Sequence, residues 1–286
     1  MPVKSLKNIL IPVNLPADSE NAIQSGVAMC KRHSAALHLL FIKTGKDPLP
    51  QNYRNAEITS LVYQADLTNL KEFRTLASQI ETEHQISCYF HELPTLSMES
   101  LEQKIKYLSI DLMILVKPEE TGYFSQLFSS YSIYKLVKAL DCPVLSLPPY
   151  KPWLEFKKVL FPVRALDESL EKLDFALPIL ERNQSEVLLF APLEGKNETQ
   201  QLSFVNILLN RANYKLQMHN LEVEREMVIA DDLAKEVIQK AEELNSDLII
   251  ITATIAKGFS AYFTENYTQR VLKYSPVPVL SIKAAN

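Results

Sequence analysis

The feature that most constrains the fold of this chain is an internal duplication. Three short segments, each rich in apolar residues, occur in the first half and return in the same order in the second half. The pairs are 7–13 with 157–163, 111–115 with 247–251, and 142–147 with 277–282. The offset is about 150 residues for the first pair and about 135 for the other two. A fixed order at a long period predicts two tandem copies of one structural unit, with helices and loops of different length.

Length and composition narrow the class of protein. The chain has 286 residues, of which 47% are apolar and 22% charged, and these values suit two ordinary globular domains. The net charge of -4 and the lack of a long basic run disfavour nucleic acid or an anionic membrane as partner. The apolar run at 9–13 is too short for a signal-peptide core or a membrane span. Three cysteines without a CxxC motif suit a reducing compartment, so we expect a cytoplasmic protein.

In the first copy, predicted as residues 1–148, strands alternate with helices. We expect strands at 8–13, 36–42, 86–91, 112–116 and 143–147. We expect helices starting at Asp18 or Ser19, within 58–83, after Ser97 and near 130–140. The inward face of the first helix is predicted to carry Ala22, Ile23, Val27 and Cys30. A proline-stiffened linker at 149–156 follows.

The second copy, predicted as 157–286, repeats this order. We expect strands at 159–163, 186–191, 221–228, 248–252 and 279–282. We expect helices capped by Asp167 and by Asp231 or Asp232, and two more near 199–215 and 264–274; Pro178 should kink its helix or start the last turn. Alternating strands and helices predict an α/β fold of two tandem doubly wound, parallel-sheet domains. Ligands of such sheets bind beyond the carboxyl ends of strands, where the strand order reverses.

The repeated segments resemble the universal stress protein family in both copies, over nearly the whole chain. The matching features are Ile-Leu-Ile-Pro-Val-Asn before a capped helix, Leu-His-Leu-Leu at 37–40, Asp-Leu-aliphatic strands at 111 and 247, and the closing Cys-Pro-Val-Leu and Val-Pro-Val-Leu. The resemblance implies a flavodoxin-like (Rossmann-like, adenine nucleotide alpha hydrolase-like) fold. It also implies that final strands pair across a two-fold axis, so that the two copies would form a pseudo-dimer within one chain. Association of two chains into a homodimer is compatible with it.

Many members of that family bind ATP and others do not. The resemblance implies which residues determine whether ATP binds. In ATP-binding members an acidic residue ends the first strand, and the loop after the fourth strand reads Gly, two residues, Gly, nine residues, Gly, Ser or Thr. Glycines there let backbone N–H groups wrap the phosphates. The first position holds Asn14 in copy one and Arg164 in copy two, and the loop positions of copy two hold Thr252, Ile255, Glu265 and Asn266. In copy one they hold Val116, Glu119, Ser129 and Ser130, or Lys117, Glu120, Ser130 and Tyr131 when counted back from Cys142.

No motif glycine is kept, so we expect both standard ATP sites to be lost and no cofactor to be bound. Lys257 and Gly258, with Ser260, form the best remaining anion-binding fragment, although an ordinary turn explains them better. Arg164 either binds an anion or pairs with Asp167 or Glu168. The weak candidates for a nucleotide site are Asn14, Arg164, Thr252, Lys257, Gly258 and Asn266.

Other polar residues receive structural interpretations. Cys88 and His91 are three apart on a predicted strand and point to opposite faces, so with His84 they are not expected to bind a metal. His38 is expected to be a buried, hydrogen-bonded core residue. The sequence contains no GxSxG, HExxH, Walker A or GxGxxG motif, and we expect no catalytic residues.

Three hypotheses about function follow. The first is a non-enzymatic tandem universal stress protein of the bacterial cytoplasm that acts through protein contacts or a ligand other than ATP. The second is a nucleotide-binding switch or weak ATPase that uses a divergent site for ATP or AMP in copy two. The third is a pocket for a small non-nucleotide ligand in the crevice of copy one.

Overall fold

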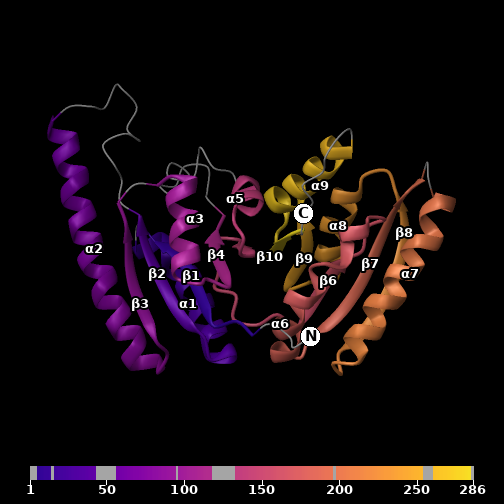
Figure 1. Cartoon of the computed structure of the whole chain (residues 1–286), viewed down its shortest axis with the longest axis horizontal. Helices are drawn as coiled ribbons and strands as arrows, with labels where there is room; N and C mark the ends of the chain where they lie inside the picture. The colour runs from indigo at the N-terminus through magenta and orange to yellow at the C-terminus, as the bar shows by residue number, and fades with distance from the viewer. Residues whose placement is uncertain are drawn as a thin grey trace. The chain divides into compact units, whose positions relative to one another are not determined.

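The computed structural model describes residues 5–13, 16–42, 56–94, 96–117, 133–195, 198–253 and 260–284. For residues 16–18, 56–67, 198–200 and 260–266 it describes the backbone only. The chain divides into two compact units (Figure 1). The N-unit comprises Leu6–Cys142 and Pro149–Leu154, and the C-unit comprises Met1–Ser5, Pro143–Pro148 and Glu155–Asn286. The domain boundaries at 1–148 and 157–286 stay predictions.

The N-unit contains four parallel strands in the order β3-β2-β1-β4. The strands are β1 (Asn8–Val13), β2 (Ala36–Ile42), β3 (Cys88–Leu93) and β4 (Leu112–Val116). The described helices are α1 (Pro16–His33), α2 (Ala56–His84), α3 (Met98–Tyr107) and α5 (Ile133–Ala139). Helix α1 contacts β1, β2 and β4, and α2 contacts β2 and β3 (Figure 1).

Two boundaries in the N-unit differ from the prediction. Helix α1 begins at Pro16, so Asp18 and Ser19 lie in its first turn and neither is the residue before the helix. Proline suits the first helical position because its fixed φ is helical and the N–H it lacks has no partner there. Strand β3 begins at Cys88, two residues later than predicted. By contrast, Ser97 forms the predicted cap of α3, with a reciprocal hydrogen-bonded box to Ser100.

The C-unit contains six strands in the order β5-β10-β9-β6-β7-β8. They are β5 (Val144–Leu147), β6 (Lys158–Pro162), β7 (Glu186–Glu194), β8 (Glu222–Ala230), β9 (Leu248–Ala253) and β10 (Val279–Lys283). Neighbouring strands are parallel except for β5 and β10, which are antiparallel. The described helices are η2 (Asp167–Leu170, a 3-10 helix), α6 (Leu173–Asn183), α7 (Glu198–Gln217), α8 (Leu233–Glu243) and α9 (Ser260–Tyr274). Helix α7 contacts β7 and β8, and α8 contacts β6 and β7.

The predicted cap at Asp167 is wrong. Asp167 starts the short 3-10 helix η2, and α6 begins only at Leu173, after Lys172. Lys172, whose side chain is buried, therefore lies between the two helices. Asp232 is the cap of α8, since its carboxylate accepts from the Lys235 amide at 3.1 Å. Pro178 lies inside α6 and is buried.

In the repeated pair of segments 111–115 and 247–251, the first residue is an aspartate with the same structural role in both units. In the N-unit, Asp111 Oδ2 accepts hydrogen bonds from the amides of Lys7 and Asn8 at 2.9 and 3.1 Å. In the C-unit, Asp247 Oδ2 accepts from two amides at the start of β6 at 3.0 and 2.9 Å. Each aspartate therefore joins the start of one strand to the start of its neighbour. The same pair of hydrogen bonds occurs in both copies.

The predicted linker is attached to α1 of the N-unit. The Trp153 amide donates to Ser25 Oγ at 2.8 Å, and Asn21 Nδ2 donates to the Pro149 carbonyl at 2.5 Å. Trp153 is buried, with the Lys151 ammonium 4.1 Å from its ring centroid. Residues 149–154 are therefore part of the folded N-unit, whereas Glu155 and Phe156 belong to the C-unit.

The fold is α/β with a predominantly parallel arrangement of strands, as predicted. The buried apolar residues come mainly from the strands and from one face of each helix, and the predicted inward face of α1 is confirmed: Ala22, Ile23, Val27 and Cys30 are all buried. None of the described helices combines the length and apolar character that crossing a membrane requires. In the C-unit the strand order reverses between β6 and β9, which places a crevice at their carboxyl ends.

Candidate functional site

The crevice at the carboxyl ends of β6 and β9 is almost filled by side chains of the C-unit. A cavity of about 10 Å³ remains there, which is about the room that one water molecule needs. Its walls are Pro162, Arg164, Leu166, Ser169, Lys172, Ile251, Thr252 and Tyr267. As far as the described residues form it, the site is therefore polar and nearly filled.

Lys172 is the most unusual residue of this crevice. It is 2% exposed, and its Nζ donates a hydrogen bond of 2.5 Å to the carbonyl of Pro162, the last residue of β6. The ammonium also lies 4.3 Å from the ring centroid of Phe161. Burial lowers the pKa of Lys172 well below its ordinary value, and the positive charge of Arg164 lowers it further. We did not predict a role for Lys172 from the sequence.

Arg164 contacts an aromatic ring of the same crevice. Its guanidinium carbon is 4.2 Å from the ring centroid of Tyr267, and its backbone N–H donates to Ser169 Oγ at 2.9 Å. Burial lowers the pKa of Arg164, while Tyr267, Glu194 and Glu168 act in the opposite direction. Among the described residues, Arg164 forms no ion pair and its buried Nε has no hydrogen-bond acceptor. The expected ion pair with Asp167 or Glu168 is thus replaced by a ring contact.

Tyr267 and Thr252 complete the crevice. Burial raises the pKa of Tyr267 to about 12, and its buried hydroxyl has no partner within the described ranges. Thr252 is 6% exposed and its Oγ1 donates to the Ser169 carbonyl at 3.4 Å. Both hydroxyls are therefore held inside the wall of the site.

The structure brings together only part of the predicted nucleotide set. Arg164 and Thr252 line the same small cavity. Asn14, Lys257 and Gly258 lie outside the described residues, and so do the loop positions from Glu119 to Tyr131 and Ile255. Asn266 belongs to α9 by its backbone, and its side chain lies outside the description.

Two of the residues that fill the crevice were missed for different reasons. Lys172 falls in the helix predicted after Asp167, where a lysine is normally solvated. Tyr267 is four residues before the buried Val271 in α9, so helical periodicity could have indicated that it faces inward.

In the N-unit, burial lowers the pKa of Lys117, the residue that follows β4, to about 8.

A second polar cluster crosses the strands of the N-unit. His38 Nδ1 lies 3.0 Å from His91 Nε2, and His38 Nε2 lies 3.2 Å from Asn8 Oδ1. His38 is 6% exposed, so the prediction of a buried, hydrogen-bonded histidine is confirmed. Burial and the neighbouring His91 lower the pKa of His38 to about 4.

The partners of this cluster fix the proton positions. Asn8 donates through Nδ2 to the Ser109 carbonyl at 3.1 Å, so its Oδ1 faces His38 as an acceptor. His38 must then carry its proton on Nε2, and its Nδ1 accepts from His91 Nε2–H. His84 contacts Lys31 instead, at 3.2 Å. Across the described ranges, no three His, Cys, Asp or Glu residues are placed to hold a metal ion.

Comparison with known proteins agrees with the fold. Residues 155–283 match the model of the universal stress protein family. A universal stress protein from Archaeoglobus fulgidus DSM 4304 is similar in structure over 98% of this chain and 97% of its own, with 15% identity and a TM-score of 0.69. A putative universal stress protein from Pseudomonas aeruginosa UCBPP-PA14 covers 98% and 94%, with 16% identity and a TM-score of 0.65.

A third similar structure is a domain of a cotransporter. The cytoplasmic domain of a prokaryotic cation chloride cotransporter is similar over 96% of this chain and 95% of its own, with 11% identity and a TM-score of 0.52. At such identities the likeness concerns the fold. No curated protein matches the sequence at a significant level.

These findings define a tandem α/β protein built from two copies of one doubly wound unit. The family model matches the second copy, at residues 155–283, and the similar solved structures extend the likeness of fold over nearly the whole chain.

Proposed function

We propose that this chain is a non-enzymatic tandem universal stress protein of the cytoplasm. It acts in a stress response through protein contacts, or through a ligand other than ATP bound in the usual way. The observation that supports this most directly is the filled crevice of the C-unit, where Lys172 and Arg164 leave a cavity of only about 10 Å³.

The filling side chains are held by interactions that a nucleotide would have to break. Withdrawing Lys172 would leave the buried Pro162 carbonyl without its donor, at a cost of about 1–3 kcal/mol. Arg164 would lose its contact with Tyr267. The replacement of every motif glycine in the sequence acts in the same direction, because side chains narrow the space for phosphates.

Calorimetric titration of the full chain with Mg-ATP, and separately with AMP, tests the proposal. We expect no saturable heat up to about 1 mM nucleotide, a concentration at which even weak specific sites of about -4 kcal/mol respond. The melting temperature should also stay unchanged at that concentration. Saturable binding at micromolar affinity would overturn the proposal.

The pairing of final strands supports an internal pseudo-dimer. Strand β5, from the first copy, pairs antiparallel with β10, from the second, with Val279 opposite Ser146. This is the contact that the family resemblance implies between final strands. We include the intramolecular pseudo-dimer in the proposal.

A second candidate function is a nucleotide-binding switch or weak ATPase with a divergent site. It is favoured by the buried Arg164 Nε, which has no acceptor within the described residues and could bind a phosphate oxygen. Thr252, Lys257, Gly258 and Asn266 would complete the site. This candidate requires that Lys257→Ala abolishes ATP or AMP binding while Lys273→Ala, at an exposed lysine of α9, leaves it intact.

A further inference from the structure

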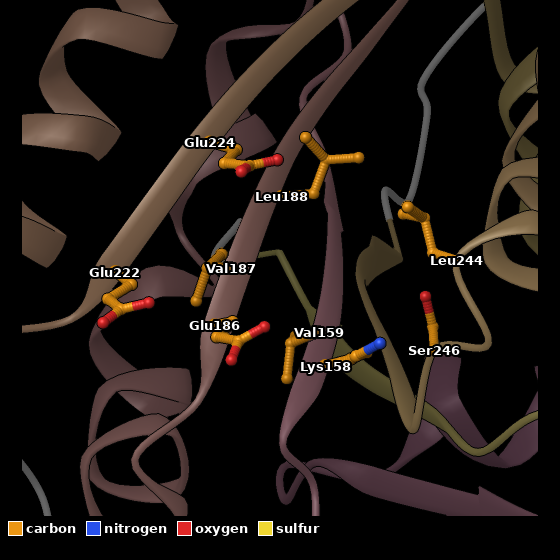
Figure 2. A pocket seen from close by; sticks show the side chains of 9 residues that line it. All are labelled: Lys158, Val159, Glu186, Val187, Leu188, Glu222, Glu224, Leu244 and Ser246. Atoms are coloured by element: carbon orange, nitrogen blue, oxygen red, sulfur yellow. The ribbon is translucent and has the colours of Figure 1, made fainter.

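We propose that the C-unit carries a binding site for a small linear diamine or polyamine at the amino ends of β6, β7 and β8. This edge of the sheet lies away from the crevice at the carboxyl ends. A pocket of about 180 Å³ opens there (Figure 2). It is lined by Lys158, Val159, Glu186, Val187, Leu188, Glu222, Glu224, Leu244 and Ser246.

The strand register gathers negative charge on one face of the pocket. Lys158, Glu186 and Glu222 are partners across β6, β7 and β8. Glu224 follows Glu222 on the same face, because side chains two apart on a strand point the same way. None of the three carboxylates has a hydrogen-bond or ion-pair partner among the described residues. One ammonium against three carboxylates leaves two negative charges to be balanced.

An unpartnered buried hydroxyl lies in the wall of the same pocket. Ser246 is 3% exposed, and its Oγ has no hydrogen-bond partner among the described residues. Its side chain lies near Leu244, on the side of the pocket away from Glu222 and Glu224 (Figure 2). The equivalent position after α3 in the N-unit holds Ile110, so the fold itself does not need a hydroxyl here. A ligand N–H is the partner that Ser246 lacks.

Size and wall chemistry favour an aliphatic amine over other cations. The pocket is smaller than the 300–1,000 Å³ typical of drug-sized ligands, so it suits a ligand of few atoms. Leu188 and Leu244 offer apolar surface to a methylene chain. The carboxylates do not cluster closely enough for a metal ion within the described ranges. A chain with an ammonium at each end balances the charge and uses the apolar wall.

A neighbouring hollow extends the site along the same edge. It measures about 360 Å³ and shares Glu186 and Glu222 with the first pocket. Glu181 lies in its wall, beside His219, whose Nδ1 is 2.6 Å from Glu181 Oε1. A polyamine longer than a diamine could therefore place a further ammonium there.

Calorimetric titration of the full chain with 1,4-diaminobutane at low salt tests the proposal. We expect saturable binding that weakens as salt is added. Glu224→Gln and Glu186→Gln should each weaken the affinity by about tenfold, the size of one charge-assisted hydrogen bond. Ser246→Ala should weaken binding while leaving the melting temperature of the ligand-free protein unchanged or higher, because it removes an unsatisfied buried hydroxyl.

Two controls separate a built site from general attraction between charges. Glu242→Gln makes the same charge change on an exposed residue of α8 outside the pocket, and should leave the affinity within about twofold. The neutral 1,4-butanediol should give no saturable heat. The proposal is overturned if the diamine shows no saturation up to about 10 mM. It is also overturned if Glu242→Gln weakens binding as much as Glu224→Gln, or if the diol binds as well as the diamine.

Discussion

At the scale of single residues, the most informative feature is the burial of a lysine in the crevice at the carboxyl ends of β6 and β9. Removing an ammonium from water is costly, and a carbonyl and an aromatic ring replace only part of its hydration. Lys172 has both partners, in the Pro162 carbonyl and the Phe161 ring. The native state therefore favours the neutral amine more than the unfolded state does.

This asymmetry predicts a pH dependence of stability. Because the pKa of Lys172 is lowered in the folded protein, the unfolded state binds more protons at any pH between the folded pKa and 10.5. Stability should rise with pH across that window, with a slope approaching about 1.4 kcal/mol per pH unit for one proton. In Lys172→Met this contribution should disappear. Urea unfolding followed by circular dichroism between pH 6 and pH 9 measures it.

The control for that experiment is Lys235→Met, which removes an exposed lysine of the same unit. Its stability should follow the same pH profile as the wild type. Equal slopes in wild type and Lys172→Met would mean that the Lys172 ammonium is hydrated in the native state.

At the scale of elements, the two copies use equivalent strand faces for different chemistry. The β1–β2 register pairs Asn8 with Ala36, and the β6–β7 register pairs Lys158 with Glu186. By the same registers His38 corresponds to Leu188. The N-unit therefore has a neutral histidine chain where the C-unit has the acidic pocket, although the backbones follow the same plan.

The histidine chain should make the N-unit sensitive to acid. The pKa of His38 is lowered from 6.5 to about 4, so its contribution to stability is fully present above pH 6.5 and is lost as the pH falls towards 4. We expect His38→Leu, which copies the C-unit residue, to cost about 1 kcal/mol at pH 7 by leaving Asn8 and His91 unpaired. The variant should then lose less stability than the wild type between pH 7 and pH 5. Urea titrations at the two pH values compare them, and a steeper loss in the variant would contradict this account.

The approach of α1 to the strands depends on Gly26. A Cβ at this position would lie 2.5 Å from Ile11 Cδ1 and 3.2 Å from Leu37 Cδ1, and both side chains are fully buried. Gly26→Ala should therefore lower the free energy of unfolding by about 1 kcal/mol, because overpacking outweighs the gain in helix propensity. The double variant Gly26→Ala, Ile11→Val removes the clashing methyl group and should be more stable than the sum of the single changes predicts. Additive effects in urea titrations would show that the clash is not real.

The element order could be predicted from sequence because the apolar runs and their spacing were clear. Strands β1, β2 and β4 have the predicted bounds, and the cap at Ser97 is confirmed. Errors fall where local chemistry was ambiguous. Helix α1 begins at Pro16, before the cap that was predicted at Asp18 or Ser19. Asp167 begins a 3-10 helix where an α-helix was expected.

The location of the candidate site could be predicted from the sequence, but not all of the side chains that fill it could. The reversal of strand order gave the crevice, with Arg164 and Thr252 at its edge. The burial of Lys172 was not predictable, because it depends on how the chain between β6 and α6 folds back to bring the Pro162 carbonyl and the Phe161 ring to the lysine. Tertiary packing decided this part of the site.

At the scale of the whole molecule, the chain leaves and re-enters the units. It passes from the N-unit to the C-unit at Pro143, returns at Pro149, and enters the C-unit again at Glu155. Strand β5 therefore stabilises a unit most of which lies later in the sequence. Ser146 is fully buried on this strand and donates through Oγ to the Val279 carbonyl at 3.3 Å.

Ser146→Pro should destabilise the C-unit alone. Proline removes the backbone donor of residue 146 and the hydroxyl contact, and we expect a loss of about 2–4 kcal/mol. Trp153, the only tryptophan, belongs to the N-unit, so its fluorescence reports that unit while circular dichroism reports both. The dichroism transition in urea should begin earlier in the variant, and the fluorescence transition should stay in place. A joint shift of both transitions would mean that the two units unfold as one.

The place of β5 in the C-unit has a consequence for folding during synthesis on the ribosome. Val144–Leu147 is translated about 135 residues before its antiparallel partner β10. At 5–20 residues per second, this apolar strand waits for roughly 7–27 s with one edge uncovered. During that interval it is a target for chaperones and for the same strand of another nascent chain, so crowded translation should favour strand-swapped dimers.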